Sequence, residues 1–341
     1  MRIRPAVLFL TLASCAGAPA TPAGTVAPPA APPSVRAAGP SAPDVAPVAT
    51  APVAPAAEAS GAPAGKLTLD QARRYMLDLV NRDRKSQGLG PVALEPGPAT
   101  VAAQRHADDM LRLGFLGHWG SDGSIPEQRH TEAGGVDMVL ENALCMTDEV
   151  RRTLDGHLLL ERAEIERAER MFFDEVPPND GHRKNILRPQ HTHVGIGIAL
   201  PVRTPTEIPV PCFVQEFTDH YATYEPLSKT AAPRQMVHLA ATLDPRMTPG
   251  GFGIARVDLP KPLPPTELNR RRSYPVPAPY QNFWPQGFKT PVAVQVTGTT
   301  MRVDVPLGDE PGLYEISTWA KPASGTGEYR MIGLRTVRVE R

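Results

Sequence analysis

The sequence has no net charge, because 36 basic side chains balance 36 acidic ones over 341 residues. A protein whose main task is to neutralise nucleic-acid phosphates needs a basic excess, so nucleic acid is excluded as the main partner. The sequence also has no run of 18 or more apolar residues, which excludes a hydrophobic membrane-spanning helix. What remains is a chain long enough for two ordinary domains.

Familiar catalytic motifs are missing as well. There is no His-Glu-x-x-His helix, no Gly-x-Ser-x-Gly elbow, no P-loop and no Cys-x-x-Cys pair. Eight of the nine histidines fall between residues 66 and 222. That segment has 18 basic and 24 acidic side chains, whereas residues 223–341 have 15 basic and 10 acidic side chains. The zero net charge is therefore the sum of an acidic, histidine-rich segment and a basic one.

The N-terminus has the pattern of an export signal. Two arginines precede a short apolar run, which is too short to span a membrane. The sequence Leu12-Ala13-Ser14-Cys15 then resembles the lipobox of bacterial lipoproteins. This resemblance implies a signal peptide over residues 1–15, acylation of Cys15 and, because Ala16 follows, an anchor in the outer membrane. The alternative is an ordinary secretory signal with an incidental cysteine, which predicts a secreted or periplasmic protein.

Residues 16–65 are predicted to be a disordered tether. They contain 12 prolines and 19 alanines but no aromatic residue, so they cannot bury enough apolar surface to fold. At roughly 3.1 Å per residue, a polyproline-like chain of this length holds a folded domain up to ~150 Å from its anchor.

Residues 66–222 begin with helical patterns. Thr68 and Gln71 predict a capping box at the start of a helix of about 18 residues. A second helix is expected from Pro98 to just before Gly114. His106 lies on its buried face, where a histidine is more often a hydrogen-bonded core residue than a ligand.

A third helix is expected over roughly 157–175, and strands follow it. Glu175 continues the apolar face of this helix and therefore needs a partner. Residues 193–200 and 213–217 alternate as strands. Helices followed by strands predict an α+β fold in which the helices pack against an antiparallel sheet.

Six motifs follow one another across about 150 residues: Leu79-Val80-Asn81-Arg82-Asp83-Arg84, Gly117-His118 with Asp122-Gly123 and Arg129, Glu141-Asn142-Ala143, Phe172-Phe173-Asp174-Glu175, Gly181-His182-Arg183-Lys184-Asn185-Ile186-Leu187 and Val194-Gly195-Ile196-Gly197. Their order resembles the bacterial branch of the CAP superfamily, the SCP-like extracellular domains. The resemblance implies an α-β-α sandwich with a central cleft where two histidines and two glutamates converge. By position these are His118, Glu141, Glu175 and His182. At the position of Glu175 this sequence differs from many bacterial members of the family, which lack a glutamate at that position.

Two imidazoles and two carboxylates suit more than one kind of site. They can ligate Zn²⁺ or another divalent cation, or they can satisfy one another by charge-assisted hydrogen bonds and hold the cleft open. Catalysis by a general base acting on water is a third reading. The residues expected to support the cleft are Trp119, Asn142, Arg183, Asn185 and Gln215.

Trp119 suits either a wall for an apolar or sugar ligand or simple loop packing. His191 and His193 share a face if the strand already begins there, which allows a weak two-residue chelate. An exposed strand start is the other interpretation. Cys145 and Cys212 remain as an even pair in an oxidising compartment, so they form either a disulfide that ties the edges of the cleft or two buried thiols.

Residues 223–341 are predicted to form a small β-sandwich, because six short alternating runs are separated by Pro- and Gly-rich breaks. The motif Asp309-x-x-Gly312-Leu313-Tyr314 resembles the tyrosine corner of immunoglobulin-like domains. The proline-dense stretch 260–285, with three consecutive arginines, is either a covering loop or a surface for an anionic envelope polymer.

Together these features predict a lipid-anchored cell-envelope protein. Its CAP-like domain is expected to bind a divalent metal, a lipid or an envelope glycan in the cleft without turnover. One alternative is a metal-dependent peptidase or esterase that uses the same two histidines and two glutamates. A further alternative is an envelope scaffold that acts through the C-terminal β domain.

Overall fold

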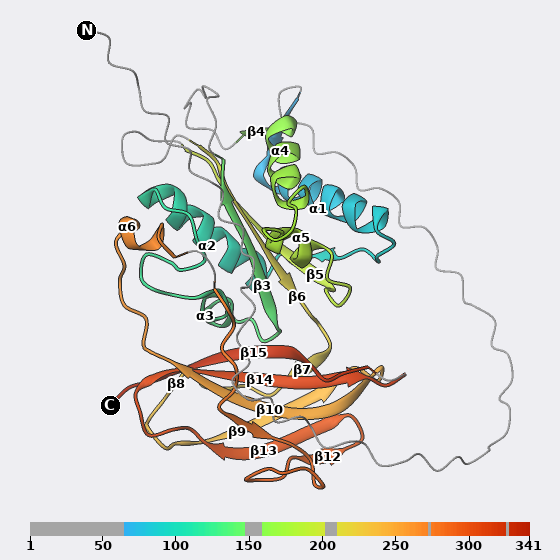
Figure 1. Ribbon diagram of the computed structural model, residues 1–341, viewed down its shortest axis with the longest axis vertical. Helices are drawn as coiled ribbons and strands as arrows, with labels where there is room; N and C mark the ends of the chain where they lie inside the picture. Colours follow the sequence, from blue (N-terminus) through green and yellow to red (C-terminus); the bar gives the residue numbers. More distant parts are fainter. Residues whose placement is uncertain (1–64, 147–158, 202–209, 272–273, 325–326) are drawn as a thin grey trace, which may run out of the picture.

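The computed structural model of the chain describes residues 65–146, 159–201, 210–271, 274–324 and 327–341 (Figure 1). The predicted signal peptide, Cys15 and all of the tether except its last residue lie outside the described residues. Two modules follow one another, an α-β-α sandwich and then a β-sandwich, as the sequence predicted. None of the described helices combines the length and apolar character that crossing a membrane requires.

The first module has a four-stranded sheet with helices on both faces (Figure 1). In spatial order its strands are β2 (Ala93–Leu94), β5 (His193–Ala199), β6 (Cys212–Thr218) and β3 (Val139–Cys145). One face is covered by α1 (Leu69–Ser86), α4 (Arg162–Phe173) and α5 (Gly181–Ile186), and the other by α2 (Pro98–Leu113) and α3 (Pro126–Glu132). A separate pair of strands is formed by β1 (Lys66–Thr68) and β4 (Leu159–Glu161).

The local signals at the first two helices are confirmed. Thr68 and Gln71 form the reciprocal capping box at the start of α1. The last turn of α2 passes into Gly114, whose φ of 70° is the left-handed conformation that glycine adopts without strain.

The third helix is shorter than expected. α4 begins at Arg162, because residues 159–161 form β4 instead, and it ends at Phe173. Glu175 therefore lies beyond the helix and does not continue its apolar face, so that prediction was wrong. Residues 147–158, where the helix was expected to begin, fall outside the described part.

The strand β3 has no counterpart among the predicted strands. Its sequence lacks alternation because both of its faces are covered, so that six of its seven residues are buried. Two-sided burial removes the period-two pattern by which a half-exposed strand is recognised. The strand that carries Glu141 and Asn142 was missed for this reason.

Two glycines of β5 let α2 lie directly against the sheet. A Cβ atom on Gly195 would come within 2.2 Å of the Ala99 backbone, and one on Gly197 within 2.2 Å of the Ala103 backbone. Any side chain at these positions would push the helix away. The two glycines of the Val-Gly-Ile-Gly motif thus allow α2 to pack closely against β5.

The second module consists of two sheets that enclose one apolar core. The five-stranded sheet orders β11 (Gln281–Phe283), β10 (Met247–Val257), β14 (Gly312–Pro322), β15 (Arg330–Val339) and β8 (Thr230–Ala231). The four-stranded sheet orders β12 (Gln295–Thr297), β13 (Thr300–Pro306), β9 (Met236–Leu243) and β7 (Ala222–Tyr224). The Tyr314 hydroxyl donates to the Glu310 carbonyl at 2.8 Å, which closes the connection as a tyrosine corner does.

The proline-dense stretch is a covering segment. It carries the short helix α6 (Pro265–Leu268), and it lies beside α2 in Figure 1. Leu268 is buried in the apolar cluster of α2, and the Asn269 side chain accepts a hydrogen bond from the Leu116 backbone. The modules also meet where the Thr336 backbone donates to the Thr131 hydroxyl at 3.1 Å. The segment therefore joins the second module to the outer face of the first.

Candidate functional site

His118 and Glu141 form the first of two imidazole–carboxylate pairs. His118 lies in the loop after α2, and its Nδ1 is 2.8 Å from Glu141 Oε1 on β3. Arg129 of α3 donates to the other carboxylate oxygen at 2.6 Å and to the His118 carbonyl at 3.0 Å. His106 is fully buried nearby, with its Nε2 3.7 Å from Glu141, as expected for a core histidine. The Glu141 carboxylate is thus held on both oxygens.

The charge on Glu141 is stabilised by these neighbours. Burial by itself would raise its pKa, but the Arg129 guanidinium and the two imidazoles outweigh burial and hold the pKa of Glu141 well below its usual range. A buried carboxylate with a paired arginine is therefore ionised throughout the physiological range.

Glu216 lies directly across from Glu141 on the neighbouring strand β6. It is fully buried, and neither of its carboxyl oxygens has a hydrogen-bond donor among the described residues. Burial and the facing Glu141 carboxylate raise the pKa of Glu216 well above its ordinary value. Glu216 is therefore a neutral acid beside an ionised one. No sequence motif marks Glu216, although the alternation of β6 places it on the same face as Cys212.

His182 and Glu175 form the second pair. His182 is the second residue of α5, and its Nδ1 lies 2.6 Å from Glu175 Oε1 while its backbone N–H donates to Oε2 at 2.9 Å. The partner that Glu175 was predicted to need is thus His182. The pair forms because the turn before α5 brings the two residues back together within seven positions.

The supporting amides connect the second pair to the sheet. Asn142 donates to the His182 carbonyl at 3.2 Å and to the Gln215 side chain at 3.0 Å. Asn185 of α5 donates to Asn142 at 2.9 Å. Gln215 donates in turn to the buried carboxylate of Glu169, whose pKa burial raises to about 8. Since Glu141 and Asn142 are neighbours on a strand, their side chains point to opposite faces of the sheet.

Arg183 and Trp119 have more local contacts. Arg183 donates to the Phe173 carbonyl at 2.6 Å and lies over the Phe173 ring, so it holds the end of α4. Trp119 meets Tyr274 edge to face at 5.2 Å, with the Arg271 guanidinium 4.9 Å above its ring. The side chains of Trp119, Arg271 and Tyr274 line a cavity of about 490 Å³ between the two modules.

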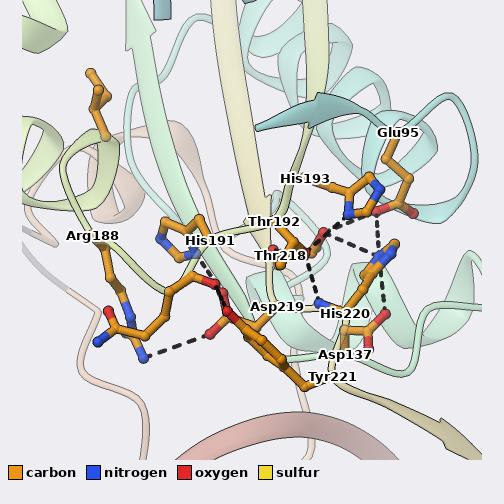
Figure 2. Close-up of polar contacts among 12 residues, drawn as sticks. Glu95, Asp137, Arg188, His191, Thr192, His193, Thr218, Asp219, His220 and Tyr221 are labelled. Atoms are coloured by element: carbon orange, nitrogen blue, oxygen red, sulfur yellow. Dashed lines mark hydrogen bonds and ion pairs between the residues drawn. The ribbon is translucent and has the colours of Figure 1, made fainter. Parts of the chain in front are cut away.

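His191 and His193 do not form a chelate. Figure 2 shows that they turn to different partners. His191 is buried, stacks on Phe217 and has its Nδ1 2.7 Å from Asp219, so it is not an exposed strand start. His193 stacks on His220 with 3.9 Å between ring centres.

His220 is the centre of the second group in Figure 2. Its Nε2 lies 3.1 Å from Asp137 and 3.3 Å from Glu95. Hydrogen bonding to Glu95 raises the pKa of His220, and burial raises the pKa of Asp137 to about 7. These ionic contacts join the loops before α2 and β3 to the segment that leaves β6. They lie where the chain passes into the second module.

Cys145 and Cys212 form a disulfide, which confirms that alternative. They occupy facing positions on β3 and β6. The bond therefore joins two neighbouring strands of the sheet and does not tie two separate edges of a cleft.

A four-ligand metal site was one of the expectations for the two pairs. Each imidazole directs its Nδ1 to a glutamate, and Arg129 and the His182 backbone N–H hold the two carboxylates as well. Carboxylates behind imidazoles are the usual outer partners of metal-binding histidines. Over the residues that the structure describes, no group of three or more His, Cys, Asp or Glu side chains is arranged to hold a metal. The described residues therefore do not bring the four side chains together as one four-ligand set.

Comparison with known proteins identifies the first module. Residues 77–200 match the model of CAP, the cysteine-rich secretory protein family. None of the curated proteins matches the chain. A solved extracellular protein containing an SCP domain from Bacillus anthracis is similar at 20% identity and a TM-score of 0.32, over 45% of this chain and 44% of that one. The match thus spans less than half of the length of that protein. Residues 77–200 are therefore identified as a CAP domain.

Proposed function

We propose that this chain is a cell-envelope protein whose CAP domain binds a ligand at His118, Glu141, Glu175 and His182 without turning it over. The supporting observation is that both imidazoles are fixed by a carboxylate at Nδ1. An imidazole fixed in this way loses little conformational freedom when a ligand binds beside it, which favours binding. The absence of the familiar hydrolase motifs supports binding over turnover.

A divalent cation such as Zn²⁺ is the first ligand to test. Its protein ligands would come from the His118–Glu141 and His182–Glu175 pairs. An envelope glycan is the second ligand, because Trp119 follows His118 directly and lines the cavity of about 490 Å³. Aromatic walls with a few polar groups suit a ring-shaped ligand. A lipid is the third.

The test is calorimetric titration of the full chain with Zn²⁺. His118→Ala and His182→Ala should each weaken binding at least tenfold, whereas His238→Ala should leave it unchanged, because His238 is an exposed histidine of the second module. Zinc binding that survives both substitutions at the pairs would contradict this assignment. If Zn²⁺ does not bind, immobilised envelope glycan and lipid vesicles are the next probes.

Hydrolysis is the second candidate function. A carboxylate behind an imidazole also orients a general base, and Glu141 does this for His118. A metal-dependent peptidase or esterase activity that disappears in His118→Ala would establish turnover. A scaffold acting through the second module predicts instead that partner capture in cells survives the same substitution.

The location is proposed from the N-terminal sequence. Acylation of Cys15 would hold the chain in the outer membrane, as its lipobox-like context indicates. Labelling of cells with a radioactive fatty acid should mark the wild type and not Cys15→Ser. Equal labelling, or release of both proteins into the medium, would favour the secreted or periplasmic alternative.

A further inference from the structure

One place where the two modules meet is a short backbone contact between residues 137–138 and residues 332–333, the module contact. Asp137, just before β3, forms an isolated antiparallel bridge with Gly333 of β15, and the Met138 N–H donates to the Ile332 carbonyl at 3.1 Å. The Tyr224 hydroxyl of β7 donates to the same carbonyl at 3.3 Å. Asp137 therefore lies where β15 and β7 of the second module reach the first, and its side chain is 12% exposed.

His220 contacts the Asp137 carboxylate from the side of the first module. Its Nε2 lies 3.1 Å from Asp137 and 3.3 Å from Glu95 (Figure 2). Glu95 is itself fixed, because it accepts hydrogen bonds from the Ala99 backbone at 3.1 Å and from the Thr218 hydroxyl at 3.0 Å. One imidazole nitrogen thus serves two carboxylates, one held within the first module and one at the module contact.

The charge on these three side chains depends on pH. Burial by itself would raise the pKa of Glu95, but hydrogen bonds from His220 and the Ala99 backbone outweigh burial and lower this pKa to about 2. The hydrogen bond to Glu95 raises the pKa of His220, and burial raises the pKa of Asp137 to about 7. In mildly acidic solution Glu95 is therefore ionised, His220 protonated and Asp137 neutral, so the three groups have no net charge. Once Asp137 and His220 have both lost their protons, the same space holds two negative charges.

The remaining titratable groups that face His220 or Asp137 are His130, His193, Asp219 and Tyr224. Burial lowers the pKa of both histidines, to about 4 for His130, so neither ring is charged near pH 7. Burial raises the pKa of Tyr224, which is neutral as well. The Arg188 guanidinium lies 3.8 Å from Asp219 and is paired with that acid. None of these groups supplies a positive charge to Asp137 when His220 loses its proton.

Closing of the module contact is linked to proton uptake by Asp137. When the contact is open, water reaches the carboxyl group and its pKa returns toward the ordinary value of about 3.9. The closed state therefore binds one more proton up to about pH 7, and the equilibrium constant for closing falls up to tenfold per pH unit over that range. The raised pKa of His220 acts in the same direction above its ordinary pKa of about 6.5. Glu95, with its lowered pKa, acts in the opposite direction and only in acid.

We propose that His220, Asp137 and Glu95 form a pH-sensitive clasp, which holds the two modules together in mildly acidic solution and releases the module contact as pH rises. Solvent can exchange protons with the clasp, since the His220 side chain is 35% exposed. The cavity of about 490 Å³ that Trp119 and Tyr274 line lies between the same two modules, so release of the clasp also moves its walls apart.

Amide hydrogen exchange of the full chain between pH 5 and 7.5 tests the proposal, with each rate corrected for the base-catalysed exchange of an unstructured peptide. The Met138 amide reports on the module contact, and the Thr336 amide, which donates to the Thr131 hydroxyl at 3.1 Å, reports on a second contact between the modules. In the wild type the protection of both amides should fall together, by up to tenfold per pH unit. The Ile316 amide, on the central strand of the five-stranded sheet, should keep its protection and shows that the second module stays folded.

Asp137→Asn separates the clasp from other effects of pH. The amide has nearly the same shape as the neutral acid and does not ionise, so the Met138 and Thr336 protection should stay constant between pH 5 and 6.5, where His220 remains protonated. Asp304→Asn is the matched control, because Asp304 also pairs with a histidine, His238 at 2.7 Å, but is 70% exposed on β13. This variant should keep the pH dependence of the wild type.

Three results would overturn the proposal. The first is wild-type protection of the Met138 amide that does not change with pH. The second is an Asp137→Asn variant that keeps the wild-type slope between pH 5 and 6.5. The third is loss of protection at Met138 while Thr336 stays protected, which would show that the contact opens locally and the modules remain together.

Discussion

Glu141 and Glu216 face each other across two strands, yet the same substitution should have opposite effects at the two positions. Glu141→Gln removes the charge that Arg129 contacts at 2.6 Å, in a site where both side chains are 1% exposed. Breaking one side of a buried ion pair costs about 3–5 kcal/mol. Glu216→Gln replaces a neutral acid by a neutral amide of the same shape, whose N–H groups face the Glu141 strand position. Near pH 5 it should change the free energy of unfolding by less than about 1 kcal/mol.

The pH dependence separates the two roles further. The pKa of Glu216 is raised in the folded state. Its contribution to the free energy of unfolding is therefore fully present below the unfolded pKa of about 4.3, and it is lost as pH rises toward the folded pKa. Over that range the wild type loses about 1.4 kcal/mol per pH unit from this group. Glu216→Gln removes this pH-dependent loss of stability. The variant should therefore become more stable relative to the wild type as pH rises. Glu141, with its lowered pKa, contributes above pH 4.3 and loses this contribution only in acid.

The assay is urea denaturation of the full chain, followed by circular dichroism and tryptophan fluorescence at pH 5, 6.5 and 8. The double variant Glu141→Gln/Glu216→Gln should be less stable than Glu141→Gln, because Glu216 can no longer ionise to compensate Arg129. Two results would refute the assignment of an ionised Glu141 and a neutral Glu216. One is an equal loss in the free energy of unfolding for Glu141→Gln and Glu216→Gln. The other is a stability difference between Glu216→Gln and the wild type that does not change with pH.

Two further predictions concern packing in each module. Gly197→Ala should lower stability by at least about 1–3 kcal/mol, because its Cβ would lie 2.2 Å from the backbone of α2, whereas Gly90→Ala, with nothing within 4 Å, should be neutral. Thermal melting measures both, and equal melting temperatures would contradict the close approach. Tyr314→Phe should cost about 1 kcal/mol through loss of the bond to the Glu310 carbonyl, while Tyr280→Phe, on a side chain that is 59% exposed, serves as control. A Tyr314→Phe melting curve that overlays the wild type would show that the corner adds no stability.

The elements that could be predicted are those whose signals are local. The capping box at Thr68, the glycine at the end of α2 and the alternation of the β-sandwich strands each depend on residues a few positions apart. β3 could not be recognised, because burial on both faces removes its alternation. Glu175 was identified as a residue that needs a partner, but its position on a helix was wrong, since α4 ends two residues earlier.

The pairing of His182 with Glu175 follows from a short turn, and the motif order already indicated both residues. Glu216 is different. It has no motif of its own, and its protonation depends on which residue lies opposite on the next strand and on the removal of water from both. His191 was likewise misjudged, because its burial depends on Asp219 and Phe217, which lie in β6 and just beyond it.

The sequence by itself determined the family motifs, the two-module order and the identity of the four candidate residues, because each rests on residue types and short spacings. Only the tertiary structure decided how those residues pair and which carboxyl group is charged. These properties depend on distance between segments far apart in the chain and on exclusion of water. Neither is a property of local sequence.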